Sequence, residues 1–129
     1  MNPARPLVLA LVVCDGVWRD PSTGKHSLMG VFSGLSAAVF PVLHPGLAVY
    51  AALTEGYGAA SVRVAVVDDA GDRVIAEATV EVGFTDPRQV VELTVAMQAL
   101  NFPDPGGYRI QLVADGHILL ERRLAVRQI

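Results

Sequence analysis

The residues of this chain whose type and spacing best suit a functional site are acidic, and the site they would form is a cation site. Asp68, Asp69 and Asp72 fall in one turn between two apolar runs, and other aspartates fall near other turns. Calcium takes several oxygen ligands, and the loops at one end of a sandwich can converge to supply them. Aspartate is also a turn residue in its own right, because its carboxylate hydrogen-bonds the nearby backbone. We therefore interpret these residues as turns, predict no metal or cofactor site, and keep a cation site as the alternative.

The histidines, the cysteine and the serines show no spacing that indicates catalysis. His26, His44 and His117 have no neighbouring ligand at the spacing of a metal site. Cys14 sits in an apolar run without a cation nearby, which is typical of a small buried hydrophobe. Ser33 lies one position away from the serine of a nucleophile elbow, and no helix is expected after it. We predict no catalytic residues and expect that the protein is not an enzyme.

Composition narrows the class of protein. A chain of 129 residues fits one domain, residues 1–129, that can bury its own core. The apolar fraction is 52% and the mean hydropathy is +0.42, which indicates strands apolar on both faces or an apolar surface for a partner. The net charge of −3 argues against a nucleic-acid partner. The single cysteine rules out an intramolecular disulfide, so a reducing compartment is expected.

The first apolar run has two interpretations. Residues 7–13 follow Arg5 and end at Cys14, so the stretch imitates a lipoprotein signal, with lipid attached at Cys14. The run is short for a signal-peptide core, and Val13 stands where a small residue is required. A buried first strand is therefore the main interpretation. The run is too short to span a bilayer, and we expect a cytoplasmic protein that has no membrane contact, with a lipid anchor at Cys14 as the alternative.

Alternating apolar residues and turn signals predict strands throughout the chain. The clearest alternation is in residues 73–82. The expected inner face there is Val74, Ala76, Ala78, Val80 and Val82, and the expected outer face is Arg73, Ile75, Glu77, Thr79 and Glu81. Residues 91–98 include good helix formers, but their alternation and their valine and threonine content favour a strand. We predict an all-β, antiparallel two-sheet sandwich with about eight strands and little or no helix. The expected strands cover residues 7–15, 26–34, 47–53, 61–68, 73–82, 91–98, 108–112 and 118–126, and residues 36–46 are expected to be a crossing loop.

Arg122 interrupts the pattern of the last strand. Strict alternation places it on the inner face with Leu120 and Leu124. A buried guanidinium without a partner would be very costly. We therefore expect either a bulge around residues 121–123 or a paired arginine at the rim of the sandwich.

The closing hairpin carries a resemblance to known proteins. The run from Phe102 to Tyr108, followed by the Asp115-Gly116 turn, resembles the last hairpin of immunoglobulin-like sandwiches. Three further features extend the resemblance: Cys14-Asp15 after an apolar strand, the run from Thr23 to Phe32, and Phe40-Pro41 followed by His44-Pro45. With them the chain resembles, over its whole length, a family of small uncharacterised bacterial proteins, a domain of unknown function. The resemblance implies a single cytoplasmic, immunoglobulin-like sandwich domain without a recorded activity, and it supplies no catalytic residues.

We therefore expect a non-enzymatic interaction module whose partner is a protein, either another chain or a second copy of this one. Unpaired sandwich edges and the high hydropathy motivate this expectation. The alternative is a small-ligand or cation-binding module that uses the loops near Tyr57, Asp69 and Asp104. The candidate partner contacts are Trp18, Tyr57, Phe40 and Phe102.

Overall fold

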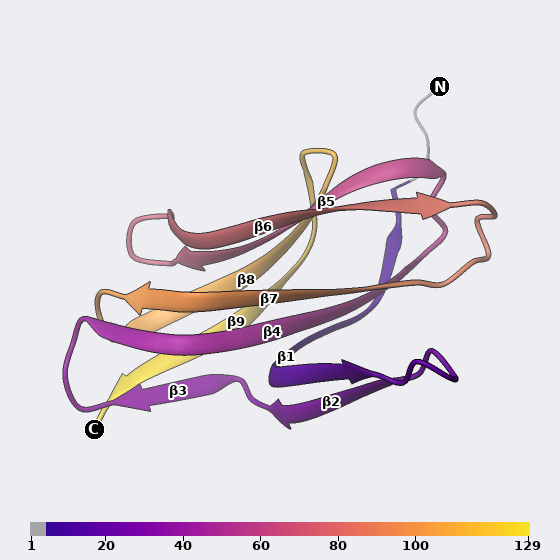
Figure 1. The fold of residues 1–129 in the computed structure, drawn as a ribbon. Helices are drawn as coiled ribbons and strands as arrows, with labels where there is room; N and C mark the ends of the chain where they lie inside the picture. Colours follow the sequence, from indigo (N-terminus) through magenta and orange to yellow (C-terminus); the bar gives the residue numbers. More distant parts are fainter. Residues whose placement is uncertain (1–4) are drawn as a thin grey trace.

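A computed structural model describes residues 5–129, which form nine β-strands and no helix (Figure 1). None of these residues belongs to a helix that could cross a membrane. The strands are β1 (Leu7–Arg19), β2 (His26–Val31), β3 (Gly34–Ala37), β4 (Val42–Thr54), β5 (Gly58–Asp68), β6 (Arg73–Phe84), β7 (Val91–Phe102), β8 (Gly106–Ala114) and β9 (His117–Gln128).

The strands form two sheets that enclose one apolar core. One sheet has the order β2-β1-β4-β7, and the other has the order β3-β9-β8-β5-β6. Side chains from both sheets meet in the core, among them Leu47 and Leu53 of β4, Val64 of β5 and Ile110 of β8. The predicted all-β, two-sheet sandwich is confirmed. The pairing is antiparallel except between β3 and β9, which run parallel.

Residues 36–46 are not the crossing loop that the sequence predicts. β3 occupies the beginning of this stretch and β4 begins at Val42, so the described chain has nine strands rather than eight. β3 is only four residues long and is held by its pairing with the distant β9. Pro45 lies within β4, opposite the one break in its otherwise continuous pairing with β7, where Ala99 has a φ of 55°. Proline can occupy such a position because no ladder hydrogen bond is needed from its nitrogen.

The alternation of residues 73–82 is confirmed in β6 from Ala76 onward, but it is wrong at Val74. Val74 is 48% exposed and its neighbour Ile75 packs against the core, because the pairing with β5 shifts register at this point. Ala76, Ala78, Val80 and Val82 pack against the core from this edge strand. Residues 91–98 are also strand, as their alternation predicts, with Leu93 and other alternate side chains buried. In residues 91–98 burial against the core favours the period-2 pattern over intrinsic helix preference.

Arg122 has a hydrogen-bond partner, so the second of the two expectations, a paired arginine, describes it. The bulge in β9 lies earlier, between the pairs Leu112–Leu120 and Val113–Ile118. Arg122 then lies opposite Ile110, and its Nη1 donates to the main-chain carbonyl of Leu11 at 2.8 Å. The guanidinium thus joins β9 of one sheet to β1 of the other.

β1 changes its partner halfway along its length. Its first part, from Leu7 to Cys14, pairs with β4, whereas the part after Cys14 pairs only with β2. Figure 1 shows the strand changing direction between the two parts. Residues 15–31, the second part of β1 with β2, form what we call the β1–β2 hairpin.

Candidate functional site

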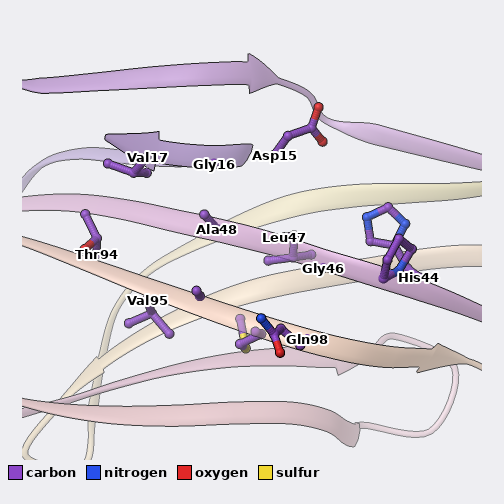
Figure 2. A pocket seen from close by; sticks show the side chains of 13 residues that line it. Asp15, Gly16, Val17, His44, Gly46, Leu47, Ala48, Thr94, Val95 and Gln98 are labelled. Carbon is purple, nitrogen blue, oxygen red and sulfur yellow. The ribbon is translucent and has the colours of Figure 1, made fainter. Parts of the chain in front are cut away.

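A groove lies between the β1–β2 hairpin and the strands β4 and β7 (Figure 2). Its volume is about 610 Å³, and its lining comes from residues 15–17 of β1, 44–48 of β4 and 94–98 of β7. Ligand sites in proteins commonly have volumes of roughly 300–1,000 Å³, so this groove is large enough to hold a ligand or part of a partner chain. It forms because β1 separates from β4 after Cys14.

Small side chains make the floor of the groove. Leu47 and Val49 point into the core, so the alternate β4 residue Ala48 lies on the outer face of the sheet. Ala96 of β7 pairs with Ala48 across the strands, and Gly46 lies nearby in β4. Because none of these three residues has a side chain beyond Cβ, space remains above the sheet for an apolar group.

Polar groups stand at the margin of the groove. His44 and Gln98 line it on β4 and β7, and Figure 2 shows both at the same end. The His44 ring makes edge contacts with Phe32 and Phe102, at centroid distances of 6.3 and 6.4 Å. Its Nε2 is buried, and no described residue gives it a hydrogen bond. His44 therefore packs against core aromatic residues on one side and lines the groove on the other.

Among the described residues, Asp15 is the only charged one that lines the groove. Its side chain lies across Gly30, which has a φ of 67° and no Cβ to displace it. Asp15 is exposed, and its carboxylate has no hydrogen bond or ion pair with any residue from 5 to 129. The groove thus combines an apolar floor with one free negative charge at its margin.

A cluster of three side chains attaches the β1–β2 hairpin to the sheet. Tyr50 of β4 donates a hydrogen bond to Glu92 Oε2 of β7, and His26 Nδ1 of β2 lies 3.1 Å from the same oxygen without hydrogen-bond geometry. The rings of His26 and Tyr50 are 5.3 Å apart. Burial raises the pKa of Tyr50 to about 12, and the Glu92 carboxylate adds to this shift. These residues are far apart in the sequence, which offers no signal that they meet.

The four predicted partner contacts do not form one site. Trp18 and Tyr57 are 52% and 70% exposed, and neither lines the groove. Phe40 is half-buried and packs against the core. Phe102 is fully buried, so the prediction of a partner contact there is wrong. The sequence predicts no strand between residues 98 and 108, but Phe102 is the last residue of β7 and packs edge-on against Tyr108 at 5.0 Å.

The acidic turn is neutralised by arginines. Arg109 contacts Asp69 at 2.6 Å, and it also contacts Asp72 and Glu121. Arg73 donates to the buried Asp68 at 2.9 Å, and this bond holds the pKa of that carboxyl below its usual range. Among the described residues, no three His, Cys, Asp or Glu side chains are placed to hold a metal ion.

The loop residues of the alternative ligand site lie at opposite ends of the molecule. Tyr57 precedes β5 and Asp69 follows it, with 11 strand residues between them. At about 3.3 Å per residue, these two turns are on the order of 35 Å apart. Asp104 lies at the Asp69 end, because it and Asp68 approach the same arginine, Arg73. Tyr57, Asp69 and Asp104 therefore cannot bind one small ligand together.

Cys14 is fully buried within β1. Its Sγ donates to the Ala48 carbonyl at 3.7 Å, and burial raises the pKa of the thiol. Leu11 and Val13, which precede it, are core residues. Lipid attachment at Cys14 would require cleavage of a segment that the fold uses as half of its first strand.

Two packed sheets with a groove beside one of them define a small β-sandwich protein. Residues 9–127 match the model of a family described as a family of unknown function (DUF6941), and the chain belongs to this family. The resemblance to a domain of unknown function is therefore confirmed. A comparison with curated proteins gave no match. A crystal structure described as an immunoglobulin-like protein from Pseudomonas aeruginosa is similar over 98% of this chain and 100% of its own, with 13% identity and a TM-score of 0.42.

Proposed function

We propose that this protein is a non-enzymatic binding module that holds a segment of a partner protein in the groove beside the β1–β2 hairpin. The observation that carries the proposal is the groove itself: about 610 Å³ of space over a floor of glycine and alanine, with few polar groups at its margin. This combination is typical of binding sites, in which apolar surface supplies affinity and a few polar groups fix orientation.

Exposed apolar side chains on the β1–β2 hairpin support a protein partner. Trp18, Met29 and Val31 of the hairpin are 52%, 53% and 56% exposed. Met29 adjoins the groove wall, because its Cε lies 3.4 Å from where a Cβ on Gly16 would be. Exposed aromatic and methionine side chains are enriched where proteins bind one another. The partner is another chain or a second copy of this one.

The cluster of Tyr50, Glu92 and His26 suits attachment of the hairpin better than catalysis. A catalytic site needs a nucleophile or base whose pKa suits its task. The pKa of Tyr50 is raised to about 12, so its phenol stays protonated at neutral pH and cannot act as a base. The carboxylate of Glu92 accepts the hydrogen bond of Tyr50, and His26 Nδ1 lies 3.1 Å from the same oxygen. We therefore assign this cluster the role of an anchor for the hairpin.

We also propose a cytoplasmic location. Cys14 is a free, buried thiol, and a protein that keeps its thiol reduced suits a reducing compartment. Fractionation of the native host with an antibody against the protein tests this assignment. Recovery in a membrane fraction that only detergent releases would contradict it.

Peptide selection tests the proposed function. A phage library of ten-residue peptides is selected against the wild-type protein, and bound peptides are measured by fluorescence anisotropy. We expect Ala96→Phe, which fills the groove floor, to weaken the selected peptides at least tenfold. The matched control Ala59→Phe adds the same ring at an exposed position of β5 and should bind as the wild type does. Failure to select any peptide, or equal binding by Ala96→Phe, would overturn the proposal.

A further inference from the structure

Asp15 differs from the other aspartates of the described chain in having no partner. Asp104 lies 4.0 Å from Arg73. The remaining aspartates all accept hydrogen bonds: Asp20 from Ser22, Asp68 from Arg73, Asp69 and Asp72 from Arg109, Asp86 from Arg88, and Asp115 from the Ser61 amide. Among the described aspartates only Asp15 leaves its carboxylate free. The glutamates Glu55 and Glu81 also have no partner among residues 5–129, but only Asp15 lies at the margin of the groove.

Steric contact rather than hydrogen bonding places this carboxylate. Asp15 belongs to β1 just after Cys14, where the strand leaves β4. Its carboxylate lies over Gly30 of β2, whose φ of 67° and missing side chain make room for it. The carboxylate of Asp15 is therefore held in place without a protein hydrogen-bond donor, so its oxygens are free to accept hydrogen bonds from a ligand.

The groove beside Asp15 fits a long basic side chain. Lysine and arginine carry an apolar stem and a charged head, and they commonly lay the stem along apolar surface. Gly46, Ala48 and Ala96 supply that surface, with Val17 on the hairpin side. An arginine head can also make two parallel bonds to one carboxylate. The net charge of −3 favours the approach of a basic segment.

We infer that the groove takes an extended segment of a partner protein that presents a basic side chain, with the stem on the floor of β4 and β7 and the cation at Asp15. This inference rests on the proposed function, because it names the partner chemistry for the same groove. It makes Asp15 the residue that determines specificity.

The experiment uses the selected peptides and their uncharged counterparts. We expect arginine or lysine to be enriched at one peptide position, and replacement of that residue by citrulline, or by norleucine where it is lysine, to weaken binding about tenfold. Asp15→Asn should weaken the basic peptide by a similar factor and leave the uncharged peptide unchanged. Glu55→Gln is the control, since it removes the same charge from an exposed carboxylate outside the groove.

The outcomes separate the two proposals. If peptides bind and Ala96→Phe blocks them, but no basic residue is enriched and Asp15→Asn binds as well as the wild type, the inference is overturned and the proposed function stands. If Glu55→Gln weakens binding as much as Asp15→Asn, general electrostatic attraction replaces the site-specific contact, and the inference is also overturned. If no peptide binds, both proposals fail.

Discussion

Arg122 shows how a residue that breaks the strand pattern can close an open side of the sandwich. Its guanidinium bonds the Leu11 carbonyl, in the part of β1 that β2 does not cover. An inward-pointing charged residue at an open strand edge also hinders pairing with other chains. One side chain on β9 thus satisfies a main-chain acceptor of the opposite sheet and protects its edge.

Replacing this arginine should lower stability measurably. In Arg122→Met the apolar stem is kept and the donor to Leu11 is lost, so we expect the free energy of unfolding to fall by about 1–3 kcal/mol, the range for an unsatisfied buried acceptor. Urea denaturation measures the change. Arg123→Met, which alters an exposed neighbour, should stay within about 0.5 kcal/mol of the wild type. Equal stability of the two variants would show that the bond to Leu11 contributes nothing.

At the scale of elements, the β1–β2 hairpin is held to β4 and β7 by side chains. Beyond Cys14, β1 has ladder pairs with β2 only, so His26, Tyr50 and Glu92 provide a polar attachment to the sheet. Segments with few ladder bonds open more easily than the core. The hairpin that borders the groove is therefore the element whose position depends most on a few contacts.

This attachment predicts a loss of stability in alkaline solution. The pKa of Tyr50 is about 12 in the folded protein and 10.0 in the unfolded chain, so folding favours the protonated phenol. Its contribution is fully present below pH 10 and is lost as the pH rises through 12. We expect the wild type to lose more stability than Tyr50→Phe between these values, measured by urea denaturation with Trp18 fluorescence.

Tyr57→Phe is the matched control, because Tyr57 is exposed and remote from the hairpin cluster. It should follow the wild type throughout this range. If Tyr50→Phe and the wild type lose stability equally between pH 10 and pH 12, Tyr50 does not anchor the hairpin in the way described.

At the scale of the whole molecule, two buried aromatic residues lie where the two sheets meet. Phe102 of β7 and Tyr108 of β8 belong to different sheets and pack edge to face. The Tyr108 hydroxyl donates to the Asp104 carbonyl at 2.6 Å and so secures the connection between the two strands. The closing hairpin is scaffold, and its buried aromatics tie the sheets together.

The stability lost in three aromatic-to-alanine substitutions should increase with the burial of the residue replaced. Phe102→Ala leaves a cavity between the sheets and should cost about 3–5 kcal/mol of unfolding free energy. Phe40→Ala, at a half-buried position, should cost less, and Tyr57→Ala should stay within about 0.5 kcal/mol of the wild type. Thermal and urea denaturation measure all three. A large loss in Tyr57→Ala with a small one in Phe102→Ala would contradict the packing described here.

Much of the fold could be predicted from local sequence patterns. The alternation in β6 and the Asp115-Gly116 turn are visible in the sequence because period-2 burial and turn chemistry act over a few residues. β3 was missed because only parallel pairing with β9, some 90 residues later, makes it a strand. The groove was missed for a similar reason, since Gly46, Ala48 and Ala96 look like ordinary strand residues until β1 leaves their side.

The sequence by itself determined the all-β class and the order of most strands along the chain, because these depend on local periodicity. It also limited Arg122 to two arrangements, a bulge or a paired side chain, because burying an unpaired charge is costly. Tertiary structure alone decided that Phe102 is buried, that Asp68, Asp69 and Asp72 are neutralised by arginines, and that Asp15 is left free beside a groove. Each of these outcomes depends on which distant side chains meet. Distant contacts follow from the packing of two sheets, which no single stretch of sequence contains.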